Sequence, residues 1–125
     1  MNTEAALLSA ICKNKDIATV LTDNVDEIFI SHRDVWEGLK SYYLKFRAVP
    51  DTSVLTEKFP DFEPEQTKGE TGYYLDNLKN EFLTSRIKDI LIRNGSSLKS
   101  NSAKRVLLDM QTELYGLARM TGEVR

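Results

Sequence analysis

The chain has 125 residues, 41% of them hydrophobic and 29% charged, which is the composition of one folded domain with a modest core rather than of a disordered chain. No apolar run approaches the roughly 20 residues of a membrane-crossing helix, and the N-terminus lacks the basic start and apolar stretch of a signal peptide. Because Cys12 is the only cysteine, an internal disulfide is excluded and a reducing cytoplasm is the expected compartment.

The net charge of −2 is unevenly distributed along the chain. Residues 1–78 contain 8 Lys and Arg against 14 Asp and Glu, a balance of −6, whereas residues 79–125 contain 9 against 5, a balance of +4. A basic C-terminal part can attract nucleic acid through phosphate contacts. Its basic residues are scattered among acids, however, which favours the solvated faces of long helices. We therefore expect little direct DNA binding and no membrane association.

The first predicted helix begins at Thr3, a candidate N-cap, and carries one apolar side. Three residues recur on that side at helical spacing: Leu7, Leu8 and Ile11. A second, short helix is expected over 16–21. The β-branched segment 25–30 has no partner strand elsewhere in the chain. We therefore expect a turn there that inserts Ile28 or Phe29 into the core.

The next predicted helix is the most aromatic part of the chain. Ser31 is its candidate cap, with Asp34 in the capping-box position. The expected core face carries residues at steps of three and four: Val35, Trp36, Leu39, Tyr43 and Phe46. We expect this helix to end before Pro50, because the residue that precedes a proline avoids the helical region. Asp51 or Thr52 then caps a short helix, whose apolar residues are Val54, Leu55 and Phe59.

Prolines, glycines and acids dominate the segment 60–72, which we interpret as an acidic surface loop. Two longer helices are expected after it, over 73–93 and from the cap Ser102 to Met120, with Asn94 and Gly95 ending the first. The last helix carries a heptad seam formed by Ala103, Leu107, Met110, Leu114 and Leu117. The preceding helix continues this spacing at Leu83, Ile87 and Ile90.

These elements predict an all-α chain in which a small globular helical bundle is followed by a C-terminal antiparallel helical hairpin. We expect the bundle over 1–72 and the hairpin over 73–125, packed as one structural unit. Further apolar residues lie off the seam of the last helix, at Val106, Leu108 and Tyr115. Because each helix of a lone hairpin has one neighbour, such a hairpin cannot bury all of this surface. The hairpin is therefore predicted to associate with another copy or with a partner.

Motifs that carry chemistry are missing from the sequence. It has no Gly-rich phosphate loop, dinucleotide-binding fingerprint, His-Glu-x-x-His pair or paired-cysteine metal site. His32, the only histidine, stands at a helix start, which favours a structural contact over catalysis. Trp36 shares its helical face with core residues, which favours burial over stacking on nucleotide bases. We expect no catalysis and no cofactor or metal in this chain.

Several segments, taken in order, resemble the N-terminal domain of DnaB-like replicative DNA helicases. Residues 4–11 are similar to that family's opening helix, although Ser9 stands where Gly is usual. Residues 28–36 fit its Phe-bearing turn and His-Arg-x-Ile-Phe pattern. Residues 47–55, with Val49-Pro50, are closer to phage-encoded relatives, and residues 74–78 match a Tyr-Leu helix. The positions that carry the motif, which we assign to the fold, are Leu7, Leu8, Ile11, Phe29, His32, Arg33, Trp36, Leu39, Pro50 and Leu55.

The resemblance implies that hairpins pair between subunits to form the collar of a hexameric ring, and that this region docks primase or a helicase loader. An ATPase motor that binds ATP and Mg²⁺ would then follow beyond Arg125. The location would be the bacterial cytoplasm, including that of a phage-infected host. On this basis self-association falls on Ile87, Ile90, Leu91, Leu107, Met110, Leu114 and Leu117. Two other interpretations are open: a free-standing regulator or loader-like protein that binds such a helicase, and a nucleic-acid binder that uses the basic hairpin.

Overall fold

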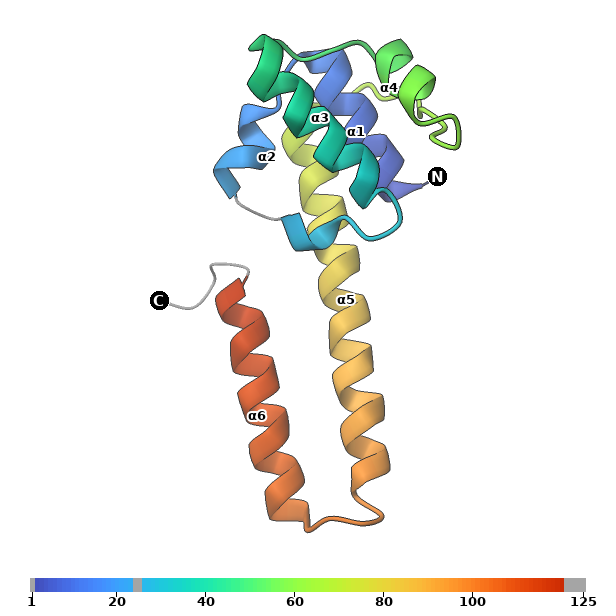
Figure 1. Ribbon diagram of the computed structural model, residues 1–125. Helices are drawn as coiled ribbons and strands as arrows, with labels where there is room; N and C mark the ends of the chain where they lie inside the picture. The colour runs from blue at the N-terminus through green and yellow to red at the C-terminus, as the bar shows by residue number, and fades with distance from the viewer. Residues whose placement is uncertain (1, 24–25, 121–125) are drawn as a thin grey trace. The chain divides into compact units, whose positions relative to one another are not determined.

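The computed structural model describes residues 2–23 and 26–120, and within them the regular structure is entirely helical, which confirms the predicted all-α class (Figure 1). No helix in these ranges is long and apolar enough to cross a membrane. The elements are α1 (Thr3–Asn14), α2 (Ala18–Asp23), the 3-10 turn η1 (Asp26–Ile28), α3 (Arg33–Phe46), α4 (Thr52–Lys58), α5 (Thr71–Ser97) and α6 (Ala103–Met120).

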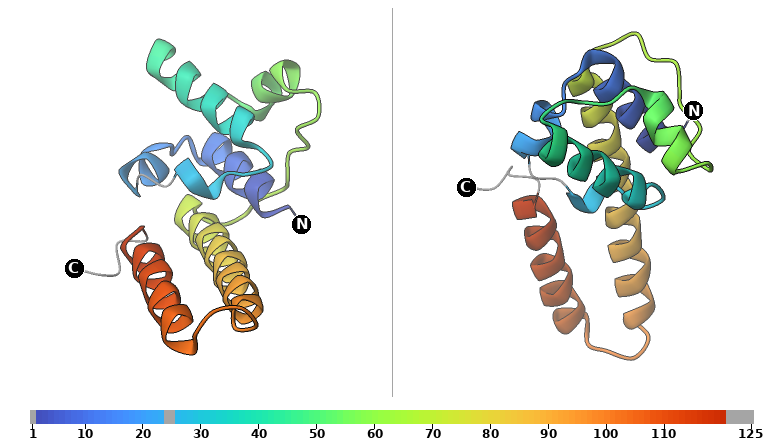
Figure 2. Two further views of the ribbon diagram at one scale, coloured as in Figure 1. Left: turned by 60° about the horizontal axis from the view of Figure 1, so that its bottom comes forward. Right: turned by 45° about the horizontal axis from the view of Figure 1, so that its top comes forward.

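The chain forms two compact units, Met1–Lys79 and Asn80–Arg125. The boundary therefore lies within α5, later than the division expected at residue 72. The first unit is built around α1, in which every residue from Ala5 to Cys12 is buried, with α2, α3 and α4 around it (Figure 2). A helix that is buried all round needs apolar or small residues on every face, and the alanines between Leu7, Leu8 and Ile11 meet that need.

The turn between α2 and α3 anchors the aromatic core of the first unit. The Phe29 and Trp36 rings stack with their centroids 4.7 Å apart, and both side chains are buried. The indole Nε1 of Trp36 donates to Asp26 Oδ1 at 2.7 Å, and Lys40 Nζ lies 3.1 Å from the same oxygen. The hydrogen bond from Trp36, together with Lys40, holds the pKa of Asp26 below its usual value. Ile28 and Phe29 both enter the core, as the turn prediction requires.

The start of α3 is held by a residue that is distant in the sequence. The predicted Ser31 cap is wrong, because the N-cap position is His32 and its side chain makes no capping bond, although Asp34 accepts from the Val35 amide at 2.9 Å. Glu4 of α1 instead accepts three backbone N–H groups. Its Oε1 bonds the amides of Ile30 and His32 at 2.9 and 3.0 Å, and its Oε2 bonds the amide of Ser31 at 3.1 Å. One carboxylate thus holds the turn that leads into α3 and joins it to α1.

The acidic segment between α4 and α5 is fixed against α1. The Ser9 hydroxyl accepts from the Glu65 amide at 3.0 Å, so the serine found where the resembling family has glycine makes a specific contact here. The Tyr74 hydroxyl accepts from the amides of Lys68 and Gly69. Lys13 Nζ donates to the Thr67 carbonyl, and Phe62 and Thr67 are buried. The sequence predicted only a surface loop, because these bonds join residues far apart in the chain.

Two helix ends and the burial of one core candidate differ from expectation. Asn2, rather than Thr3, caps α1 by accepting from the Ala5 amide at 2.9 Å. The predicted stop at Asn94 and Gly95 is wrong, because α5 continues to Ser97. Phe46, expected in the core, is 55% exposed at the end of α3. Asn is a better N-cap than Thr, which accounts for Asn2, and the hydrogen bonds of Asn94 outweigh the local preference of Asn-Gly for ending a helix.

Candidate self-association surface

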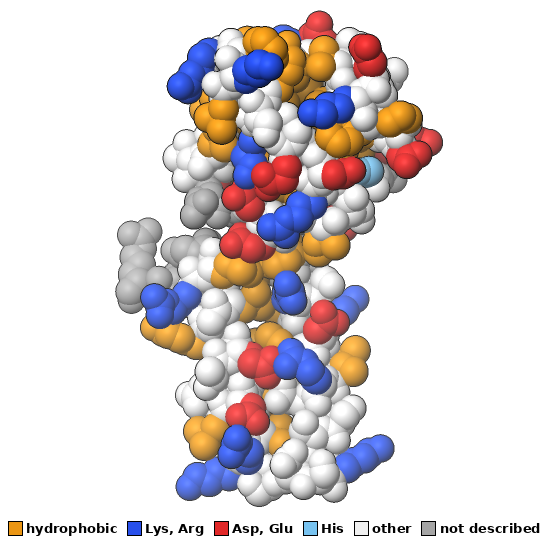
Figure 3. All heavy atoms as spheres, viewed as in Figure 1, with side chains coloured by type: hydrophobic (Ala, Val, Ile, Leu, Met, Phe, Trp, Pro, Cys, Tyr) orange, Lys and Arg blue, Asp and Glu red, His pale blue; other side chains and the backbone are white. Residues whose placement is uncertain are grey.

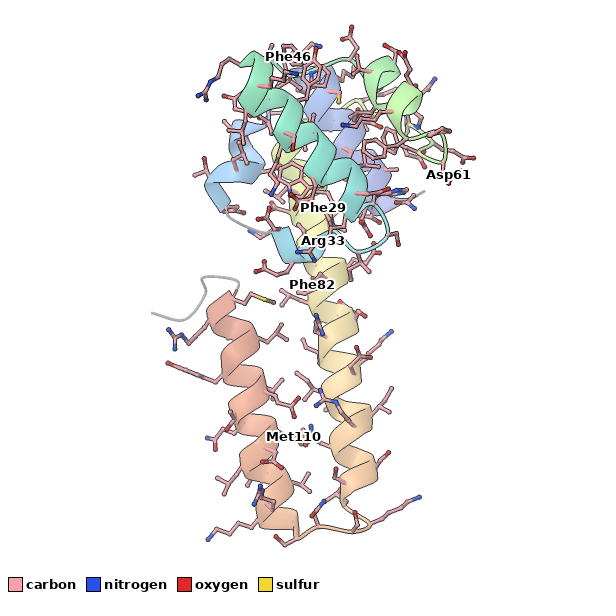
Figure 4. The ribbon with its side chains drawn as sticks, viewed as in Figure 1. Phe29, Arg33, Phe46, Asp61, Phe82 and Met110 are labelled. Carbon is pink, nitrogen blue, oxygen red and sulfur yellow. The ribbon has the colours of Figure 1, made fainter. Side chains whose placement is uncertain are left out.

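The second unit is a helical hairpin formed by the last part of α5 and by α6, whose side chains are shown in Figure 4. Ile90 of α5 and Val106 of α6 are buried, and Met110 and Leu117 are half-buried. Val106 was expected off the seam, but it faces inward. These four residues form the seam between the two helices. Of the predicted association residues, Ile90, Met110 and Leu117 are thus occupied within the hairpin itself.

A polar cluster crosses this seam and fixes its register. Asn94 is buried in α5 and donates from Nδ2 to the Ile90 carbonyl at 2.7 Å and to Glu113 Oε1 at 3.1 Å. The other oxygen of Glu113 pairs with Arg93 Nη2 at 2.6 Å. A buried amide with satisfied partners favours one alignment of two helices, because a slip would leave it unpaired. This contact also accounts for the uninterrupted course of α5 through Asn94.

The Glu113 cluster predicts an acid-sensitive hairpin. The hydrogen bond from Asn94, with the nearby Arg93, holds the pKa of Glu113 below its usual value. The carboxylate therefore contributes stability at pH values above the ordinary glutamate pKa, and this contribution is lost as the pH falls through the lower folded value. When the pH is lowered from about 6 to about 3, we expect the melting temperature of the wild type to decrease more than that of Glu113→Gln. Parallel decreases in circular-dichroism melts would contradict this.

Nine large apolar side chains of the hairpin are exposed among the residues that the structure describes, and four of them define what we call the apolar face. Ile87 and Leu91 of α5 are 41% and 52% exposed, and Leu107 and Leu114 of α6 are 64% and 38% exposed. Each pair is spaced by four or seven residues, so each pair forms a stripe along its helix. All four belong to the predicted association set. The predicted heptad seam is wrong at Ala103, Leu107 and Leu114, and at Ile87 of the preceding helix, because these residues are exposed outside the contact between the two helices.

The two stripes lie on the same side of the hairpin. Leu91 follows the inward residue Ile90, and Leu107 follows the inward residue Val106, so each stripe is rotated by one residue in the same sense from its seam. Because the helices run antiparallel, equal rotations from facing seams turn toward one common side. The apolar face is therefore continuous across both helices.

The opposite side of the seam is hollowed and carries charged and apolar residues together. A groove of about 860 Å³ is lined there by the charged residues Arg86, Asp89, Arg93 and Glu113 and by the apolar residues Ile90, Ile92, Leu117 and Met120, with Ser96 and Gly116 between them. The residues on this side stand one position before inward ones, as Arg93 stands before Asn94. All the charged residues of the groove lie on this side, whereas the apolar face carries the two regular stripes, so the apolar face is the better candidate for burial against another copy.

The fold motif residues lie in the first unit. Seven are buried: Leu7, Leu8, Ile11, Phe29, Trp36, Leu39 and Leu55. Pro50 is buried as well, whereas Arg33 is exposed. His32 is half-buried, with its ring edge-on to Phe62 at 5.7 Å between centroids. The buried members are part of the core of the first unit, whereas the exposed Arg33 is not. Comparison with protein-family models, curated proteins and solved structures found no match to this chain.

Proposed function

We propose that the chain is the non-catalytic N-terminal module of a hexameric replicative DNA helicase, which associates with other copies through its hairpin and docks primase or a helicase loader. The apolar face formed by Ile87, Leu91, Leu107 and Leu114 is the observation that carries this proposal. The ordered resemblance to DnaB-like N-terminal domains supports it. ATP and Mg²⁺ would act in a motor domain that follows this chain, and the ring would work in the bacterial cytoplasm.

The energy available from the apolar face suits a moderately stable pair. Burying a large apolar side chain completely contributes about 1.5–3 kcal/mol, and these side chains are already about half covered. A symmetric pair brings eight of them together, which gives roughly 6–12 kcal/mol. Association costs about 4–15 kcal/mol in lost freedom. The hairpins alone therefore pair at moderate to high concentration, and a motor domain would strengthen the ring.

A two-fold arrangement fits this face best. In a two-fold pair the same patch is used by both copies, so an apolar patch meets an apolar patch. The Arg93–Glu113 cluster lies on the other side and remains solvated. No buried charge is then left unpaired in the interface.

The test is the mass in solution over a concentration series. We expect the wild type to form a dimer or higher oligomer, and Leu107→Glu/Leu114→Glu to be a monomer with the same helical circular dichroism. Each charge would have to be buried without a partner, which costs several kcal/mol. The matched control is Leu108→Glu/Tyr115→Glu, because these residues are also exposed and seven apart but lie off the apolar face. A monomeric wild type, or a control that dissociates equally, would refute the proposed surface.

A further inference from the structure

The first unit has an aromatic surface that the association proposal does not use. Phe59, at the end of α4, lies over Gly38 of α3, where an added Cβ would come within 2.7 Å of its ring. Tyr42 follows Gly38 by one helical turn, and Phe46 follows Tyr42 by another. The Tyr42 and Phe46 rings are in contact, with centroids 4.6 Å apart. We name this row of rings, Phe59, Tyr42 and Phe46, the aromatic stripe.

Two lysines lie over rings of the aromatic stripe. Lys45 Nζ lies over the Phe46 ring at 5.3 Å, and Lys58 Nζ lies over the Phe59 ring at 5.8 Å. Neither lysine has an acidic partner among the residues that the structure describes. Figure 3 shows hydrophobic and basic side chains adjoining over α3, and Figure 4 labels Phe46 at its end.

The local charge contrasts with that of the whole unit. Residues 1–79 contain 9 Lys and Arg against 14 Asp and Glu, a balance of −5. Residues 38–50 contain three basic residues and no acid, and within the described part of the chain only Lys40 of the three is paired, with Asp26 and Glu37. Lys58 lies outside this stretch, between Glu57 and Asp61, so the positive charge of the patch is concentrated at the Phe46 end. A patch that is basic and aromatic, on a unit that is acidic as a whole, favours a partner whose binding surface combines acidic residues with an apolar face.

We infer that the aromatic stripe docks an acidic amphipathic helix of a partner protein. Rings placed one turn apart along α3 form a ridge that an apolar helix face can pack against, while the partner's carboxylates reach Lys45 and Lys58. A nucleic acid fits less well, because the ammonium groups already lie over the ring faces on which bases would stack. This inference rests on the proposed docking function and locates it on the first unit.

The probe for the test is a fluorescein-labelled synthetic helix of roughly 18 residues, or five turns, with Leu and Phe on one face and Glu on the other. Its binding to the full chain is followed by fluorescence anisotropy. We expect Phe46→Ser and Lys45→Glu each to weaken binding about tenfold, which equals about 1.4 kcal/mol. Leu44→Ser is the matched control, because Leu44 is also exposed but lies about 200° around the helix from Phe46. We expect its affinity to stay within about twofold of the wild type.

Two further ligands test whether the stripe prefers an acidic helix to a basic helix or to a nucleic acid. A helix with Lys in place of Glu is expected to bind poorly, and so is a thymidine oligonucleotide of similar length. Unchanged binding by Phe46→Ser, or tighter binding of either control ligand, would overturn the inference. The solution mass of each variant is measured in parallel. A variant that loses probe binding but keeps the wild-type mass shows that the aromatic stripe binds the probe independently of self-association. A wild type that is monomeric but still binds the probe refutes only the proposed hairpin surface.

Discussion

Replacing Trp36 with alanine is expected to lower the free energy of unfolding of the first unit by about 3–5 kcal/mol. The indole is almost fully buried and stacks on Phe29, so its removal leaves a cavity in the core. It also removes the donor to Asp26 Oδ1. Because small domains are stable by only about 5–15 kcal/mol, this single change removes a large fraction of the stability.

Cys12 offers a direct measurement of this effect. It is the only cysteine, it is buried in α1, and burial raises the pKa of its thiol to about 11. A thiol reagent therefore reacts with it only when the first unit opens. Every 1.4 kcal/mol of lost stability raises the open population tenfold, so we expect labelling of Trp36→Ala to be faster by a factor on the order of 10²–10³. An unchanged labelling rate would show that Trp36 does not hold the core.

Two milder variants separate packing from hydrogen bonding at this site. Trp36→Phe keeps an aromatic ring but loses the Nε1 donor. We expect the lost hydrogen bond to lower the free energy of unfolding by about 1–2 kcal/mol, in addition to the cost of the smaller ring. Asp26→Asn keeps an oxygen that can accept from Nε1 while removing the ion pair with Lys40. A larger cost for Trp36→Phe than for Asp26→Asn would place the energy in the indole bond rather than in the ion pair.

The sequence was sufficient for the features that depend on periodicity. The apolar steps of Leu7, Leu8 and Ile11, and of Trp36 and Leu39, predicted helices and buried faces, because a repeat near 3.6 residues places side chains on one side whatever the helix later packs against. The seven-residue step from Leu107 to Leu114 predicted a shared stripe for the same reason, but its assignment to the seam within the hairpin was wrong, because both side chains are exposed outside that seam.

Features that depend on contacts between distant residues were beyond sequence analysis. Asn94 followed by Gly95 is a helix stop by local preference, but the bonds of Asn94 to Ile90 and Glu113 outweigh that preference. Phe46 fits the core period, yet it lies at the end of α3 and is exposed. Periodicity gives the direction of a side chain, whereas burial also requires a neighbouring element at that height along the helix.

Glu4 is the strongest example of such a contact, and its removal is the second prediction with a large effect. We expect Glu4→Ala to lower the free energy of unfolding of the first unit by about 1–3 kcal/mol. Its carboxylate accepts three amides of the turn that leads into α3, where the N-cap residue His32 makes no side-chain capping bond. Water can reach part of this site and replace some bonds, which keeps the cost below that of losing Trp36.

Glu4→Gln is the informative intermediate, because the two carboxylate oxygens have different partners. Oε1 serves Ile30 and His32, and Oε2 serves Ser31. A glutamine keeps one oxygen and places an NH₂ group against a remaining N–H donor, so we expect a cost between those of the wild type and Glu4→Ala. The control is Glu57→Ala, which removes an exposed glutamate of α4. Thermal melts and Cys12 labelling should both rank the variants as wild type, Gln, Ala; a Gln variant as stable as the wild type would mean that the Ser31 amide needs no protein partner.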